Sequence, residues 1–181
     1  MEDPIIAFWK WAYSDLRCNT VRPMLAEYIV GKTLDCLGTG RQEWAAWDFV
    51  YKSRRIEVKS AGYVQSWNPT SKSRIVFGIR ESRNAWCHDS NKYLGPGRHA
   101  HIYIFCLNTQ LDPQLSGNLD ESDWKFFVFS TDELISDFGS QKTVGLDRLQ
   151  RVCQPVFVAD LKASVDAKIA TIELSKTIVT G

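Results

Sequence analysis

The chain has 181 residues, of which 44% are hydrophobic and 24% are charged, and its formal net charge at pH 7 is +1. This length and apolar content suffice for a buried core and indicate most simply one domain. The near-zero charge argues against a generally basic coat for nucleic acid but allows a locally basic cleft.

The composition also points to a compartment. No stretch approaches the roughly 18 to 20 consecutive apolar residues of a membrane span. The first residues, Met-Glu-Asp-Pro, lack the basic and then apolar order of a secretory signal. The five cysteines include no Cys-x-x-Cys pair, so they indicate neither a disulfide framework nor a zinc site. We therefore expect a cytoplasmic protein without membrane association.

Two helices are predicted before the first strand. Residues 4–16 carry an apolar stripe at helical spacing, and Asp3 is a suitable N-cap for them. The second helix is expected from about residue 20 to residue 37, where Gly38 follows as a helix terminator. Glu27 lies on this second helix.

Three strands are predicted next. Residues 44–51 and 54–60 are expected to pair as a β-hairpin, and residues 74–79 alternate as a third strand. Together they predict an antiparallel meander. The polar segment that follows, up to residue 101, is predicted to be irregular, with one helical turn near residues 82–87.

The second half of the chain predicts the centre of the sheet. Residues 102–107 form a continuous apolar run, which is typical of an inner strand buried on both faces. A further strand is expected at 124–130, a helix at 131–138 with Thr131 as its N-cap, and an amphipathic helix at 160–172. These elements predict an α/β (α+β) fold in which a central mixed β-sheet has helices on both faces.

Asp48, Glu57 and Lys59 are the strongest candidate site residues. A strand has a side-chain period of two, so Glu57 and Lys59 share one face, and Asp48 lies on the neighbouring strand of the hairpin. Two carboxylates can bind a hard cation such as Mg²⁺, and a nearby ammonium group can position a water molecule. The alternative is an outward-facing Asp48 and a cross-strand salt bridge on a solvated face.

These residues resemble the motif of the PD-(D/E)XK nuclease superfamily, and the match covers roughly residues 20 to 80. Its elements are Glu27, Asp48, Glu57-Val58-Lys59 and the downstream Tyr63 and Gln65. One departure is Trp47, which stands where the family name has a proline.

The resemblance implies one restriction endonuclease-like domain over residues 1–181, with its core at about 20–130 and a C-terminal helical extension at about 131–181. It implies a Mg²⁺-dependent deoxyribonuclease, with Mn²⁺ as a substitute. Asp48, Glu57 and the backbone carbonyl of Val58 would bind the metal, Lys59 would activate water, and Glu27 and Gln65 would hold water and lysine in place.

The expected partner is DNA, and a homodimer would allow both strands of a duplex to be cut. The candidate substrate contacts lie close to the motif in sequence: Ser60, Tyr63, Arg55, Lys72, Arg74 and Arg80. Trp67 could stack on a base, although a tryptophan more often lies in a core. The competing hypothesis is a nuclease-fold protein without catalysis that binds nucleic acid or serves in assembly.

Overall fold

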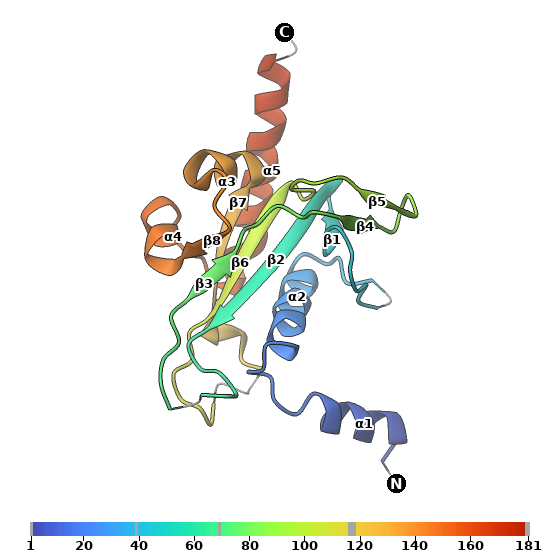
Figure 1. The fold of residues 1–181 in the computed structure, drawn as a ribbon, viewed down its shortest axis with the longest axis vertical. Coiled ribbons are helices and arrows are strands. Elements are labelled where there is room, and N and C mark those ends of the chain that lie inside the picture. The colour runs from blue at the N-terminus through green and yellow to red at the C-terminus, as the bar shows by residue number, and fades with distance from the viewer. Residues whose placement is uncertain (1, 39, 69, 116–118, 180–181) are drawn as a thin grey trace.

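A computed structural model describes residues 2–38, 40–68, 70–115 and 119–179 of the chain (Figure 1). Within these residues, four strands form the central sheet in the order β1-β2-β6-β7. Their bounds are Phe49–Tyr51 for β1, Arg54–Gly62 for β2, Ile102–Asn108 for β6 and Trp124–Ser130 for β7. β2 and β6 are parallel, whereas the two outer pairs are antiparallel. The predicted mixed α/β fold with a mixed central sheet is thus confirmed.

β6 occupies the centre of the sheet, as its apolar run predicted. All of its residues are buried. Ile104 and its even-numbered neighbours contribute to one hydrophobic core, and Phe105 and its odd-numbered neighbours contribute to the other. A strand between two cores needs apolar side chains at every position, which explains the unbroken pattern.

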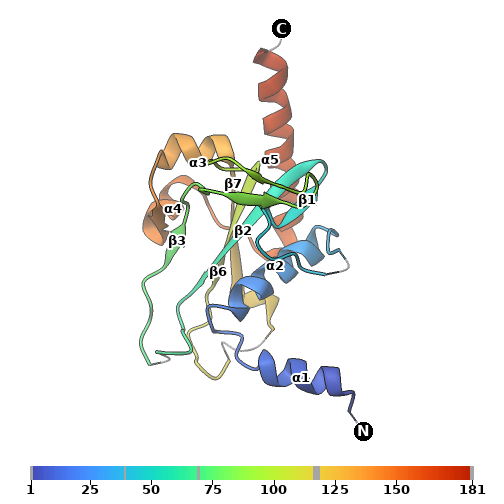
Figure 2. The same cartoon turned by 45° about the vertical axis from the view of Figure 1, so that its right-hand side comes forward.

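Helices cover both faces of the sheet (Figures 1 and 2). On the Ile104 side lie α2 (Val21–Thr33) and α5 (Val158–Val179). On the Phe105 side lie α3 (Thr131–Phe138) and α4 (Leu146–Val152). The last helix therefore packs against the sheet through Leu161, Val165, Ile169 and Ile172.

The predicted meander of three strands is wrong. β3 (Val76–Gly78) pairs antiparallel with β8 (Thr143–Gly145) in a separate small sheet. Alternate residues of this segment are buried, Phe77 among them, and join the core on the Phe105 side. A strand with one apolar face suits a covering layer, whereas the position beside β2 goes to the fully apolar β6.

The segment before β6 also differs from the prediction. Instead of a helical turn near residues 82–87, it forms a hairpin of β4 (Ala85–Cys87) and β5 (Lys92–Leu94). The rings of Trp86 and Tyr93 pack edge to face across this hairpin, with 5.0 Å between their centroids. Such aromatic cross-strand pairs stabilise short hairpins.

Helix boundaries deviate by a few residues. The first helix, α1 (Pro4–Ala12), is shorter than predicted, and the Asp3 carboxylate caps it by accepting a hydrogen bond from Ile5 N at 2.9 Å. α2 ends at Thr33. Ser130, not Thr131, is the N-cap of α3 and forms a capping box with Glu133. A one-turn 3-10 helix spans Glu121–Asp123. None of the helices in the described ranges combines the length and the apolar composition that a membrane span requires.

Candidate active site

A cavity of about 360 Å³ lies at the edge of the central sheet, just before the first residue of β1 and beside the part of β2 that extends beyond it. Glu27 reaches it from α2, Asp48 from the residue before β1, and Glu57 and Lys59 from β2. Val58 and Ser60 also line it. Segments that are far apart in the sequence thus contribute their predicted site residues to one cavity.

Asp48 is held against the edge of β2. Its backbone N donates to the Ile56 carbonyl at 2.9 Å, and its Oδ2 accepts a hydrogen bond from Val58 N at 2.6 Å. The hairpin register pairs Phe49 with Ile56, and its continuation brings Asp48 opposite Glu57. Residues 44–48 form a loop with one isolated bridge instead of the predicted start of the strand.

The carboxylates concentrate negative charge around Asp48. Burial raises the pKa of Asp48 to about 7, and the neighbouring Glu57 and Glu27 carboxylates add to the increase. The hydrogen bond from Val58 and the charge of Lys59 act in the opposite direction but are outweighed. A carboxylate in such a setting favours a bound proton or a bound cation.

Lys59 forms an ion pair with Glu57 inside the cavity. The pair does not lie on a solvated face, because the side chain of Glu57 is only 19% exposed. Burial lowers the pKa of Lys59, but the Glu57 carboxylate, its hydrogen bond and the charge of Asp48 together raise the pKa above its usual value. Lys59 is therefore a protonated donor in this state of the site.

Arg41 is a site residue that the sequence analysis missed. Its Nε and Nη2 donate to the two oxygens of the buried Glu27 carboxylate at 2.6 and 2.9 Å. This bidentate contact raises the pKa of Arg41. Arg41 lies in the loop after α2, where no periodic pattern indicates the direction of a side chain, so only the fold reveals the pair.

The predicted metal ligands are all oxygen donors, the kind that a hard cation prefers. Among the described residues, no group of three or more His, Cys, Asp or Glu side chains is arranged as a metal site. The predicted set uses only two such side chains, Asp48 and Glu57, together with the Val58 carbonyl, all of which are oxygen donors. Ser60 also lines the cavity, and its buried hydroxyl has no hydrogen-bond partner within the described parts of the chain.

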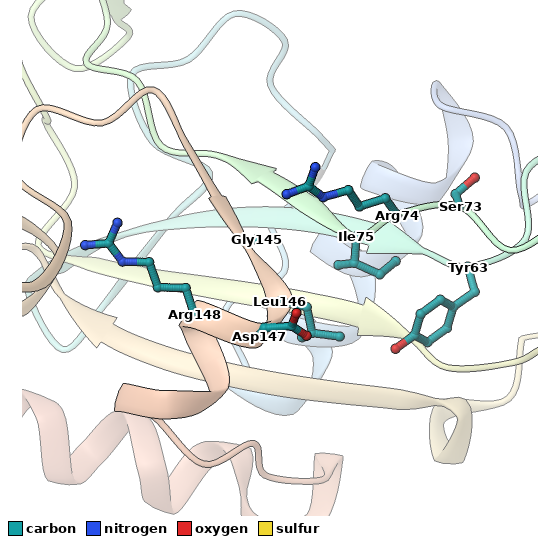
Figure 3. Close-up of a pocket in the computed structure, with 8 residues that line it drawn as sticks. All are labelled: Tyr63, Ser73, Arg74, Ile75, Gly145, Leu146, Asp147 and Arg148. Atoms are coloured by element: carbon teal, nitrogen blue, oxygen red, sulfur yellow. The ribbon is translucent and has the colours of Figure 1, made fainter.

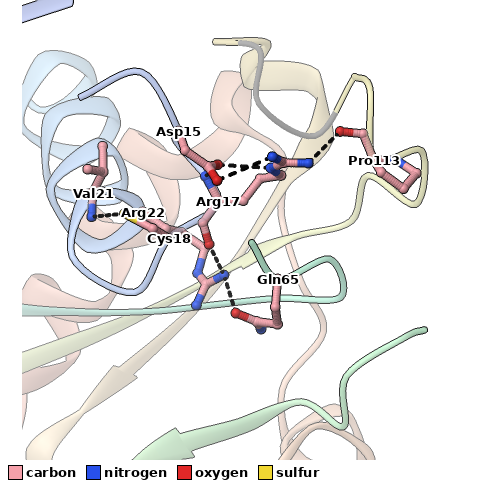
Figure 4. Close-up of polar contacts among 7 residues, drawn as sticks. All are labelled: Asp15, Arg17, Cys18, Val21, Arg22, Gln65 and Pro113. Atoms are coloured by element: carbon pink, nitrogen blue, oxygen red, sulfur yellow. Dashed lines mark hydrogen bonds and ion pairs between the residues drawn. The ribbon is translucent and has the colours of Figure 1, made fainter. Parts of the chain in front are cut away.

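Gln65 lies apart from this cavity, in a buried contact with Arg22 (Figure 4). Arg22 Nη1 donates to Gln65 Oε1 at 3.0 Å and to the Arg17 carbonyl at 2.9 Å, and Gln65 Nε2 donates to the Gly62 carbonyl at 2.9 Å. These bonds join the beginning of α2 to the chain that leaves β2. The structure thus gives Gln65 a positioning contact rather than a place beside the carboxylates.

Most of the predicted phosphate contacts also lie elsewhere. Tyr63 and Arg74 line a second cavity, of about 430 Å³, beside the start of α4 (Figure 3). Lys72 lines a neighbouring cavity with Arg74 and Trp67, whose side chain is 71% exposed and does not lie in a core.

The two remaining arginines lie at other places on the fold. Arg55 N donates to His101 Nδ1 at 2.9 Å, and its guanidinium lies 4.9 Å from the centroid of the Trp47 ring. Arg80 is exposed just after β3. Of the predicted substrate contacts, Ser60 is the one that shares the cavity with Asp48.

No family model matches the chain, and no curated protein matches it either. Any assignment of function therefore depends on the cavity and the residues that line it.

Proposed function

We propose that this chain is a metal-dependent nuclease that hydrolyses phosphodiester bonds in DNA. The observation that carries the proposal is the convergence of Glu27, Asp48, Glu57 and Lys59 on one cavity. Acidic residues alternate with lysines on many strands, but here Glu57 and Lys59 are partly buried beside two further carboxylates. Perturbed ionisable groups that share a cavity are typical of catalytic sites.

The arrangement of the elements supports a restriction endonuclease-like core. α2, which carries Glu27, packs on the hairpin formed by β1 and β2. β6 then runs parallel to the strand that carries Glu57 and Lys59. The chain between β2 and β6 holds β3, β4 and β5, which is a departure from the expected meander.

Each residue has a role in hydrolysis. Asp48, Glu57 and the Val58 carbonyl would hold Mg²⁺ or Mn²⁺. When bound, the cation supplies Lewis-acid polarisation of the scissile phosphate. Lys59, protonated and fixed by Glu57, donates a hydrogen bond that orients the attacking water. Glu27 orients water from the other side of the sheet edge and is itself held by Arg41.

One observation favours the alternative of a binding module without catalysis. Lys59 neutralises Glu57, and Arg41 neutralises Glu27, so two carboxylates already have cationic partners. A site stabilised by its own ion pairs can persist without metal. Cleavage and metal binding separate the two hypotheses.

The test combines cleavage with calorimetry. Purified protein is incubated with linear, circular and single-stranded DNA in Mg²⁺ or Mn²⁺, and metal binding is measured by titration calorimetry. We expect wild-type cleavage, and Lys59→Ala should lower its rate at least about 100-fold, because positioned proton donors contribute about that much. Glu57→Gln should lose both cleavage and metal affinity.

Lys168→Ala is the matched control. Lys168 is also a half-buried lysine, paired with Glu133 at 2.5 Å, but it lies on α5 and lines none of these cavities. Its replacement should leave cleavage unchanged. If the wild-type protein shows neither cleavage nor metal binding in any of these conditions, the nuclease proposal is contradicted and the binding module is supported.

A further inference from the structure

Trp44 stands at the mouth of the carboxylate cavity with its side chain in solvent. It lines the cavity together with Glu27, Asp48 and Lys59, yet 88% of its surface is exposed. This is the largest exposure among the exposed large hydrophobic residues that the structure describes. An indole has a large apolar surface, so a location in water beside a reactive site needs an explanation.

The backbone holds Trp44 in this place at some cost. Its φ angle is +61°, a left-handed conformation that is uncommon for a bulky residue. The chain just after it is fixed, because Ala46 N donates to the Trp86 carbonyl at 2.8 Å and Asp48 N donates to the Ile56 carbonyl. Residues with strained backbone angles that persist in a fixed loop are often found at ligand sites.

A cavity of about 430 Å³ with both polar and apolar walls adjoins the site on the α2 side. It shares Glu27, Arg41, Gln42 and Asp48 with the carboxylate cavity. Its other walls include Tyr28, Leu37 and Phe49. Cavities of this size with apolar walls and a few polar groups are typical of small-ligand sites.

We propose that Trp44 is a stacking platform for an unpaired nucleobase next to the scissile phosphodiester, so that the preferred substrate is single-stranded or frayed DNA. This inference rests on the proposed nuclease function. The flat group attached to a DNA phosphodiester is the base, and its face stacks on exposed aromatic side chains without regard to sequence. In an intact duplex both faces of the base are already stacked. The net charge is only +1, so contacts with bases can contribute to the binding free energy beside contacts with phosphates.

Equilibrium binding in EDTA tests the stacking without catalysis. The probe is a fluorescein-labelled single-stranded oligonucleotide, and anisotropy gives Kd for wild type, Trp44→Ala, Trp44→Phe and Trp11→Ala. We expect Trp44→Ala to weaken binding about 5- to 150-fold, which corresponds to one stacked base. Trp44→Phe should restore most of the affinity, because phenylalanine keeps an aromatic face.

Trp11→Ala is the matched control, because Trp11 is also highly exposed, at 78%. It lies on α1, which extends away from the body of the protein (Figure 1). This variant should bind like wild type. Circular dichroism melting verifies that all variants are folded. A fully abasic oligonucleotide of the same length should bind wild type more weakly than the intact oligonucleotide does, and the loss should be smaller for Trp44→Ala.

The outcomes separate this inference from the nuclease proposal. Unchanged Kd in Trp44→Ala, or equal loss with Trp11→Ala, would overturn the stacking platform even if wild type cleaves DNA. A preference of wild type for intact duplex over single strands would overturn it as well. Binding that depends on Trp44, without cleavage by wild type, would support stacking and contradict the nuclease.

Discussion

Asp48 makes the stability of the metal-free protein depend on pH. Its pKa is about 7 in the folded protein, against an ordinary value of 3.8, so the folded state holds a proton that the unfolded chain releases. The resulting stabilisation is fully present below about pH 4 and is lost as the pH rises through 7. Between these limits the free energy of unfolding should fall by at most about 4 kcal/mol.

Asp48→Asn isolates this effect. The amide oxygen can still accept the hydrogen bond from Val58 N, but the side chain no longer titrates. In urea denaturation with EDTA from pH 4 to 8, the variant should have a flatter profile than wild type and be the more stable of the two at pH 8. Parallel profiles for the two proteins would show that Asp48 titrates normally. Added Mg²⁺ should stabilise wild type but not the variant.

The sequence predicted the residues whose positions follow from local geometry. The period of two places Glu57 beside Lys59, and the hairpin register places Asp48 opposite Glu57. It could not predict Arg41, because a loop residue paired with a helix residue 14 positions earlier has no periodic signal. For the same reason the burial of Gln65 against Arg22, 43 residues apart, was not visible.

At the level of elements, strand existence was easier to predict than strand pairing. The apolar runs at β6 and β7 indicate strands directly, and β2 is indicated by the alternation of Ile56 and Val58 with charged residues. Pairing depends on competition between strands for the same edge, and β6 takes the place beside β2 that β3 was expected to fill. The β4 and β5 hairpin was missed because each strand has only 3 residues and lies within a polar segment.

Gly31 is where α2 comes close to β1. A Cβ atom there would lie 2.7 Å from Leu37 Cδ2 and 2.9 Å from Phe49 Cζ. Gly31→Ala should therefore lower the free energy of unfolding by about 1 to 3 kcal/mol, as overpacking does, although alanine favours helix by about 1 kcal/mol. Thermal and urea denaturation measure the change. Because Phe49 follows Asp48, metal affinity should also decrease.

Gly38→Ala provides the comparison. Nothing lies within 4 Å of the corresponding Cβ position at this exposed glycine after α2, and its stability should change by less than about 0.5 kcal/mol. If Gly31→Ala were as stable as wild type, the close packing of α2 on Phe49 would be wrong.

At the scale of the whole molecule, the two hydrophobic cores join the central sheet to the helices α2, α3, α4 and α5. The first helix, α1, lies outside both cores. The core on the Ile104 side joins α2 and α5, which are distant in sequence. The core on the Phe105 side joins α3, α4 and the β3 and β8 pair. α1 contributes no buried residue to either and extends away from the body (Figures 1 and 2).

Deletion of residues 2–12 should therefore leave the free energy of unfolding within about 0.5 kcal/mol of wild type, because no buried surface is lost. By contrast, Leu161→Ala in α5, at a side chain with no exposure, should cost about 2 to 5 kcal/mol. Urea denaturation followed by circular dichroism compares the stability of the deletion variant with that of Leu161→Ala. Hydrogen exchange should find the α1 amides unprotected, since an isolated helix of 9 residues has only marginal stability. A loss of several kcal/mol on deletion would mean that the apolar side of α1, with Phe8 and Trp9, packs against the protein in solution.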